Sequence, residues 1–331
     1  MKPKSIKSLL ALALLAPGVL FAQTTAKTTP VGYVSLGNNG SVPANTDVNI
    51  SIPLLQPSVS TGVVASISGS DINFSGTPAL GNLTTAPHIA VIENNAGSGI
   101  IGLITANDAD SVTVSLQSGQ ALTGVAAADK VSIRPAWTVL GFLGSAMPVG
   151  TQLQAWSGAA QGIVLAPDLI FEWDGTNWVD TNSFEAADNT VLYPGEGFVL
   201  RTIDAVTNFS ISGEVPTAKH NLALSGNSTP GVGQDNVISY ISPVDEIIGS
   251  ANVGYVVGDQ LLYWDNTAAG TVKAPQVLEF DGSDWVDTNS FEAVTTTFAL
   301  KGGVSYVYRR AADAPATVQQ WVDSQSYVSS L

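Results

Sequence analysis

A sixteen-residue stretch occurs twice in this chain, and this repetition limits the fold more than any other feature. The sequence FEWDGTNWVDTNSFEA at residues 171–186 returns as LEFDGSDWVDTNSFEA at residues 278–293. The similarity spreads outward: Trp156 corresponds to Trp264, and Asp129-Lys130-Val131 resembles Asp235-Asn236-Val237. Two copies at this spacing predict two paired units of about 90 residues, because solenoid repeats are shorter and more numerous.

The residues inside each unit favour strands. Short runs rich in Val, Ile, Thr and aromatic residues are interrupted by Gly, Pro and Asn. Asp174-Gly175 and Asp281-Gly282 each lie between two aromatic-flanked runs, a pattern that predicts a β-hairpin because Gly adopts positive φ at little cost. Short helical turns are expected at residues 138–145 and 243–250. The prediction is an all-β fold of duplicated β-sandwich or barrel-like units, a leading β region and few short helices.

The expected organisation follows from these patterns. Residues 66–75 and 100–116 predict two hairpins in the leading region, and Asp47-Val48-Asn49-Ile50-Ser51 resembles residues 129–133, which suggests a diverged first copy. Pro, Gly and Ser between the units predict a connector. The predicted boundaries are a signal peptide at 1–22, an N-terminal β region at 23–128, the first unit at 129–216, the connector at 217–234, the second unit at 235–322 and a C-terminal tail at 323–331.

The N-terminus predicts export. Lys2, Lys4 and Lys7 precede an apolar run at residues 9–16, followed by Pro17-Gly18 and a short tail ending at Ala22, the layout of a secretory signal. A membrane anchor is the alternative, but the run is shorter than the roughly 20 residues that cross a bilayer. The expected location is extracellular, at the cell surface or periplasmic.

Composition excludes several function classes. The chain has no Cys, which excludes disulfides and thiolate zinc sites. A net charge of -15 argues against nucleic acid and anionic lipid as partners, since both attract Lys and Arg. Charged residues make up only 12%, so the surface must consist largely of Ser, Thr, Asn and Gln.

The chain resembles a known family. The stretches TTPVGYVSL, LTGVAAADKVSIRPAWTVLGFLGSA and QDNVISYISPVDEI, together with the FDGxxW hairpins, resemble an uncharacterised family of signal-bearing secreted proteins known mainly from verrucomicrobial bacteria. This chain departs from the family where Val179-Asp180 and Val286-Asp287 stand in place of basic residues. The resemblance implies export and a β architecture, and implies no activity.

Catalytic signals are scarce. The two histidines, His88 and His220, lie in no recognisable triad, metal motif or nucleophile elbow, and no phosphate-binding loop occurs. Carboxylates are plentiful, and glycoside hydrolysis needs only a pair of them. Residues repeated in both units are typical of a repeated scaffold, however. We therefore expect no enzyme and assign no catalytic residue, with a carboxylate-dependent hydrolase as an alternative.

Two repeated sets of side chains are candidates for binding. Calcium prefers oxygen ligands and is the one cofactor that the acidic hairpins would suit. Side chains along a strand point alternately to its two faces, however, which argues that these carboxylates do not converge on one ion. Amphipathic aromatic side chains gather at binding surfaces, although a repeated Trp more often fills a core. The candidate metal ligands are Asp174, Asp180, Asp281 and Asp287, and the candidate binding residues are Trp156, Trp178, Trp264 and Trp285.

The predicted function is that of an exported, non-enzymatic structural or adhesive protein of the cell envelope or extracellular matrix. Its expected partners are further copies of itself or other envelope proteins, contacted through strand edges. A carbohydrate-binding module, with or without calcium, is the alternative, and polysaccharide is then the partner.

Overall fold

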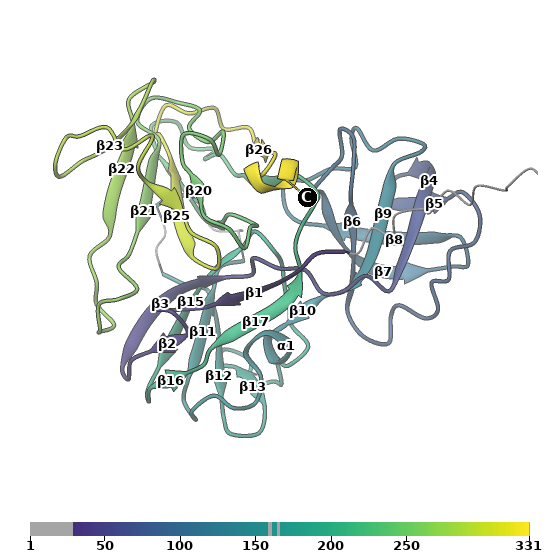
Figure 1. Ribbon diagram of the computed structural model, residues 1–331, viewed down its shortest axis with the longest axis horizontal. Helices are drawn as coiled ribbons and strands as arrows, with labels where there is room; N and C mark the ends of the chain where they lie inside the picture. The colour runs from purple at the N-terminus through teal and green to yellow at the C-terminus, as the bar shows by residue number, and fades with distance from the viewer. Residues whose placement is uncertain (1–28, 158–160, 164–165, 331) are drawn as a thin grey trace, which may run out of the picture.

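The computed structural model describes residues 29–157, 161–163 and 166–330 of the chain (Figure 1). The predicted signal peptide at 1–22 lies outside these residues. Strands dominate, and the helices are α1 (Val139–Leu143) and the 3-10 helix η1 (Ser326–Ser330). The all-β prediction is confirmed. Within the described ranges, no helix has the length and apolar character needed to cross a membrane.

Two five-stranded antiparallel sheets form the larger part of the molecule, and they have the same order of connections. The first has the order β13 (Trp178–Asp180), β12 (Leu169–Trp173), β11 (Gln152–Ala155), β15 (Gly197–Thr202), β3 (Thr46–Ser51). The second has the order β23 (Trp285–Asp287), β22 (Gln276–Phe280), β21 (Gln260–Tyr263), β25 (Ser305–Arg310), β19 (Gln234–Ser239). Each strand of one sheet therefore has a counterpart in the other.

Shorter strand pairs flank the sheets in the same corresponding way. The pair β1 (Val31–Ser35) and β17 (Ser210–Glu214) matches β18 (His220–Leu224) and β26 (Gln319–Asp323). The pair β10 (Trp137–Thr138) and β14 (Val191–Leu192) matches β20 (Glu246–Ile247) and β24 (Ala299–Leu300). An additional pair joins β2 (Ser41–Val42) to β16 (Val206–Thr207).

The predicted helical turns have different outcomes. The helix α1 forms where residues 138–145 predicted it, because the Thr138 side chain accepts a hydrogen bond from the Gly141 amide at its N-terminus. Residues 243–250 contain β20 and then a turn, in which the Ser250 amide donates to the Ile247 carbonyl at 2.8 Å, so a turn forms there but no helix. Ile247 pairs in β20 as Thr138 pairs in β10, and its side chain has no oxygen to cap a helix.

A closed six-stranded barrel forms the remaining part of the molecule, at the right of Figure 1. It closes because its first strand pairs with its last, and Val64, Ile72, Val112 and Val131 lie in its core. Both hairpins predicted for this region are present. The strands in spatial order are β4 (Ser60–Ser68), β5 (Asp71–Phe74), β8 (Ser111–Leu116), β7 (Ile101–Asn107), β6 (His88–Ile92) and β9 (Lys130–Pro135).

The barrel is inserted into the first sheet's part of the chain, which differs from the expected boundaries. Residue 129 was expected to begin the first unit, but it leads into β9, which pairs with β4 and β6 in the barrel. The edge strand of the first sheet is β3, which precedes the barrel in sequence. The expected connector at 217–234 contains β18. Both β3 and β9 have a similar sequence pattern, and only their long-range pairing distinguishes them.

A buried arginine joins the barrel to the first sheet's body. Arg134, in β9, forms ion pairs with Glu214 at the end of β17 and with Glu93 at 3.3 Å. Its guanidinium also donates to the Gln56 carbonyl at 2.8 Å. These contacts lie where the chain enters and leaves the barrel, so they hold the insertion in place.

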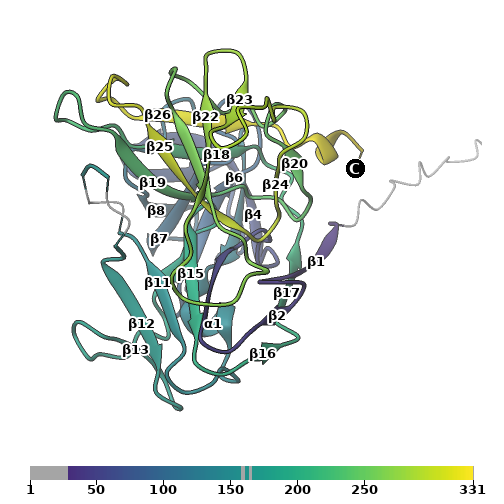
Figure 2. The same cartoon turned by 90° about the vertical axis from the view of Figure 1, so that its left-hand side faces the viewer.

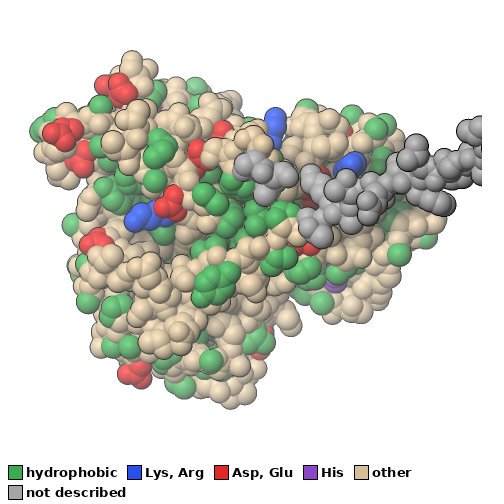
Figure 3. Space-filling model, in the orientation of Figure 1, with side chains coloured by type: hydrophobic (Ala, Val, Ile, Leu, Met, Phe, Trp, Pro, Cys, Tyr) green, Lys and Arg blue, Asp and Glu red, His purple; other side chains and the backbone are tan. Residues whose placement is uncertain are grey.

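The two sheets contact each other through corresponding strands. The Ser305 hydroxyl in β25 donates to the Phe198 carbonyl in β15 at 2.9 Å, and Glu196 forms a bridge with Ile238. The two sheets lie one above the other in both ribbon views, with the barrel beside them in Figure 1 and behind them in Figure 2. Charged side chains are sparse on the face drawn in Figure 3, as the composition predicts.

Candidate functional site

Trp178 and Trp285 are core residues. They are 0% and 1% exposed, and each pairs across its hairpin with another aromatic side chain, at ring distances of 5.7 Å to Trp173 and 5.6 Å to Phe280. Their indole N–H groups donate to carbonyls at 3.1 and 3.2 Å. Neither side chain presents a face to a ligand, so the proposed binding role does not fit these two residues.

Asp174 and Asp281 organise the hairpin turns. The Oδ1 atom of Asp174 accepts the amides of Thr176 and Asn177 at 2.7 and 2.8 Å, and Asp281 accepts those of residues 283 and 284, both at 2.8 Å. These backbone hydrogen bonds lower the pKa of both carboxyl groups. Gly175 and Gly282 follow with φ of 98° and 105°, as the hairpin prediction requires.

Asp180 and Asp287 cap the loop after each hairpin. Asp180 accepts the amides of Asn182 and Ser183 at 2.7 and 3.3 Å, and Asp287 accepts those of the corresponding residues at 2.7 and 3.2 Å. In the part of the chain that the structure describes, no three His, Cys, Asp or Glu side chains gather as a metal site. The four aspartates therefore have turn-forming roles in both units.

Trp156 and Trp264 lie where the two sheets meet. They follow the corresponding strands β11 and β21, and both are partly buried. Together they line hollow B, a cavity of about 260 Å³ between the sheets. Trp156 also lines hollow A, of about 120 Å³, and Trp264 also lines hollow C, of about 660 Å³. The three adjoining hollows form one seam, which we call the cleft.

Hollow B combines aromatic and charged walls. Arg201 donates to both carboxylate oxygens of Asp47, at 2.7 and 2.8 Å, and Lys273 lies in the same wall. The amide side chains of Asn49 and Gln154 complete the polar lining. Amide, carboxylate and cationic groups between two indoles suit a polar ligand that has hydrogen-bonding groups and apolar faces.

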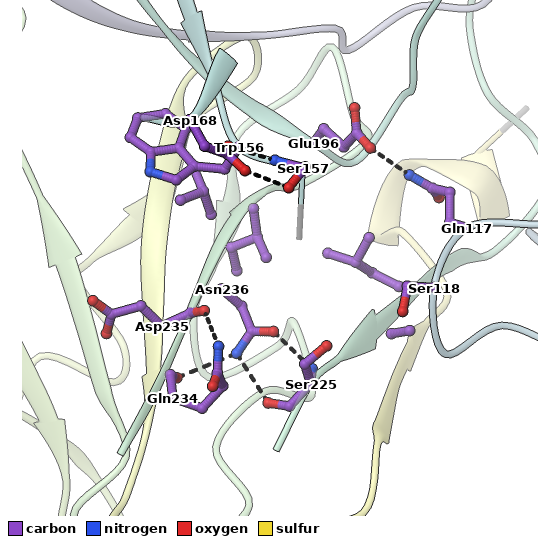
Figure 4. A pocket seen from close by; sticks show the side chains of 14 residues that line it. Gln117, Ser118, Trp156, Ser157, Asp168, Glu196, Ser225, Gln234, Asp235 and Asn236 are labelled. Carbon is purple, nitrogen blue, oxygen red and sulfur yellow. Dashed lines mark hydrogen bonds between the residues drawn. The ribbon is translucent and has the colours of Figure 1, made fainter. Parts of the chain in front are cut away.

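Hollow A brings together all three parts of the molecule (Figure 4). Gln117, after the barrel strand β8, donates to Glu196 at 2.9 Å. The Ser157 amide donates to Asp168 at 2.8 Å, beside Trp156. Burial raises the pKa of Glu196 to about 7, although its hydrogen bonds from Gln117 and Tyr193 oppose the shift.

The two indole N–H groups of the cleft differ. Trp264 donates to the Lys273 carbonyl at 3.1 Å. The Nε1 atom of Trp156 is buried and has no hydrogen-bond partner among the described residues. An unpaired buried donor is costly, so the wall of the cleft retains one unsatisfied N–H beside its polar lining.

Sequence reasoning found two of the cleft residues and missed the others. Trp156 and Trp264 were identified by their corresponding positions, whereas Asp47, Arg201 and Glu196 come from distant segments. The signal that would find Asp47 and Arg201 is the corresponding ion pair of the second sheet, Asp235 with Arg309, at 2.7 Å. No such repeated signal marks Glu196.

The two histidines lie outside the cleft lining, in structural settings. Burial lowers the pKa of His220 to about 3, and its ring packs 4.1 Å from that of Trp321. The His88 Nδ1 atom lies 3.0 Å from the Leu83 carbonyl. The described residues that line the cleft therefore offer aromatic, amide, carboxylate and cationic groups but no imidazole. A scan against protein-family models, a search of curated proteins and a search of solved structures each find no match to this chain.

Proposed function

We propose that this chain is an exported, non-enzymatic adhesive protein of the cell envelope or extracellular matrix, and that it holds polysaccharide in its cleft. The observation that carries the proposal is the meeting of Trp156 and Trp264, from corresponding positions of two sheets, on one polar hollow. Indole faces stack on the C–H faces of sugar rings, while amide and carboxylate groups bind hydroxyls. The N–H of Trp156, which has no hydrogen-bond partner among the described residues, adds one donor for a sugar oxygen.

Export and envelope location are part of the proposal. They are supported by the charged and apolar layout of residues 1–22 and by a surface poor in charge but rich in small polar residues. The net charge of -15 keeps such a protein soluble between contacts.

A glycan array tests the cleft. We expect the purified chain to retain at least one class of polysaccharide, and Trp156→Ala or Trp264→Ala to weaken its affinity about 10-fold or more, since stacking and burial contribute roughly 1.5–3 kcal/mol per ring. Tyr33→Ala is the control, because Tyr33 is an exposed aromatic in β1, outside the cleft lining. Absence of glycan binding, or an equal loss in the Tyr33 variant, would contradict the proposal.

The same array, run with calcium and with a chelator, tests the cofactor alternative. The candidate ligands Asp174, Asp180, Asp281 and Asp287 already accept turn amides. We therefore expect affinity to be unchanged by calcium. A calcium-dependent affinity that these aspartates control would favour a metal-assisted site.

A hydrolase is the second candidate, because Glu196 and Asp168 line one hollow and the raised pKa of Glu196 suits a general acid. New reducing ends released from a bound polysaccharide, and lost in Glu196→Gln, would favour it. Both Glu196 oxygens accept hydrogen bonds, from Gln117 and from the Tyr193 amide, which favours a positioning role. We expect binding without release of reducing ends.

A further inference from the structure

Phe184 and Phe291 occupy corresponding positions in the two loops that follow β13 and β23. Each side chain is 82% exposed, and the backbone φ is 61° and 59°. Large aromatic residues rarely adopt positive φ, because Cβ then crowds the backbone. Two bulky apolar rings are thus held in solvent by an unfavourable backbone conformation.

Hydrogen bonds hold each loop in this shape. The Phe184 amide donates to the Asp180 carbonyl at 2.7 Å, and the Phe291 amide donates to the Asp287 carbonyl at 2.8 Å. The aspartate side chains cap the same loops, and short bridges close them at Val179–Ala186 and Val286–Ala293. The two rings are therefore presented by rigid frames of the same construction.

The fold gives no reason for a phenylalanine at these positions. Asn or Gly adopts positive φ with less strain. An exposed ring also adds little to the stability of the fold, because it buries little apolar surface. Elsewhere the two units use different residues to make the same contact. The Trp178 amide donates to Asp188, whereas the corresponding Trp285 amide donates to the Thr295 hydroxyl, both at 2.8 Å. Phenylalanine is nonetheless present in both loops, at a position where its ring is exposed and its backbone is strained.

The two sequence segments that carry the rings are acidic. Residues 135–200 and 274–300 contain no Lys or Arg. The acidic residues of these segments are Asp168, Glu172, Asp174, Asp180, Glu185 and Asp188 in the first unit, and Glu279, Asp281, Asp284, Asp287 and Glu292 in the second. An apolar ring in an acidic setting complements an apolar pocket with a basic rim.

We propose that Phe184 and Phe291 are two equivalent anchors for a cationic protein surface that carries an apolar pocket, and that the chain bridges two such partners. The strands that carry the loops, β13 and β23, lie at opposite ends of the two-sheet body in both ribbon views (Figures 1 and 2). Two anchors so placed engage separate partner molecules. This contact is independent of the polysaccharide cleft.

Bead-bound peptide libraries test the anchors. The probe is a set of peptides with Lys or Arg around apolar positions, together with matched peptides in which Ser replaces the apolar residues. We expect the chain to be captured by the first set only, with at least 10-fold loss of capture in the double variant Phe184→Asn, Phe291→Asn and weakening in high salt. Each single variant should still be captured but should no longer cross-link beads, because one anchor remains.

Controls separate this contact from folding and from the cleft. Val59→Ser, at another exposed apolar position, should bind and cross-link normally. The Phe184→Asn and Phe291→Asn variants should unfold at the same or higher temperature, and Trp156→Ala should be captured normally. Equal capture of the wild type and the double variant, lowered stability of the Asn variants, or Phe-dependent binding to lipid vesicles, glycans or a second copy instead of the peptides would overturn the proposal.

Discussion

The backbone amide of Asp47 donates to the carbonyl of Gly270 at 3.1 Å, which joins the edge strand of the first sheet to the loop that follows β21 in the second. The corresponding bond runs the other way, from the Asp235 amide to the Gly162 carbonyl, also at 3.1 Å. Each sheet thus completes the edge of the other. This exchange places Trp156 and Trp264 on a common cleft.

Alanine at the exchanged glycines should destabilise the chain. Gly162 and Gly270 have φ of 94° and 110°, where a Cβ is strained. We expect Gly162→Ala and Gly270→Ala each to lower the free energy of unfolding by about 1–3 kcal/mol in urea denaturation. Ala269→Ser, at the exposed neighbouring position, should have almost no effect. Unchanged stability in both Ala variants would show that the exchange contributes little.

Tryptophan substitutions should separate core from cleft. Trp178→Ala and Trp285→Ala each remove a fully buried ring and should lower the free energy of unfolding by about 3–5 kcal/mol. Trp156→Ala and Trp264→Ala, at partly exposed positions, should have less than half that effect. Chemical denaturation of the four variants measures the difference, and equal losses would contradict the assignment of a cleft.

The two repeated ion pairs should differ in strength. The side chains of Asp235 and Arg309 are 2% and 20% exposed, whereas those of Asp47 and Arg201 are 14% and 39% exposed. We expect Asp235→Asn to cost about 3 kcal/mol, because it leaves a guanidinium without its buried partner. Asp47→Asn should cost about 1 kcal/mol or less, because solvent screens the more exposed pair. Denaturation curves that rank the variants in the opposite order would contradict this burial argument.

His220 should make stability fall in acid. Its pKa is about 3 when folded, against an ordinary value of 6.5, so the unfolded chain binds the proton more readily between these values. The contribution of His220 to stability is complete above pH 6.5 and is lost as the pH falls toward 3. Relative to His220→Phe, the wild type should lose about 1.4 kcal/mol per pH unit between pH 6 and pH 4. Parallel pH profiles of the two proteins would refute the shift.

Glu196 should make the stability of the fold decrease as the pH rises, which is the opposite of the effect of His220. Its pKa is about 7 when folded, against an ordinary value of 4.5, so its contribution is present below pH 4.5 and is lost as the pH rises through 7. Glu196→Gln keeps a hydrogen-bonding side chain without the charge. The wild type should lose stability relative to this variant, by about 1.4 kcal/mol per pH unit, from pH 5 to pH 7. A constant difference across this range would indicate an unshifted carboxyl group.

The local sequence pattern was sufficient to predict the two hairpins, but it was insufficient to assign other strands to a sheet or to the barrel. Asp174-Gly175 and Asp281-Gly282 specify a turn through their own backbone and side-chain chemistry, so the sequence predicted both hairpins. The strand containing Asp47 and the strand after Asp129 have similar patterns, yet the first belongs to a sheet and the second to the barrel. Pairing between distant segments separates them, and no local pattern contains that information.

The strand content, the repeated turns and the absence of cysteine chemistry could be predicted from the chain alone, because these depend on residue type and on neighbours along the chain. Tertiary contacts alone make Trp178 and Trp285 core residues and place Trp156 and Trp264 along a cleft, although each pair occupies corresponding positions of the two units. The physical reason is that burial and cavities arise where surfaces from distant segments meet. In this chain, the decisive meeting is that of β15 with β25, which places the ends of β11 and β21 around one hollow.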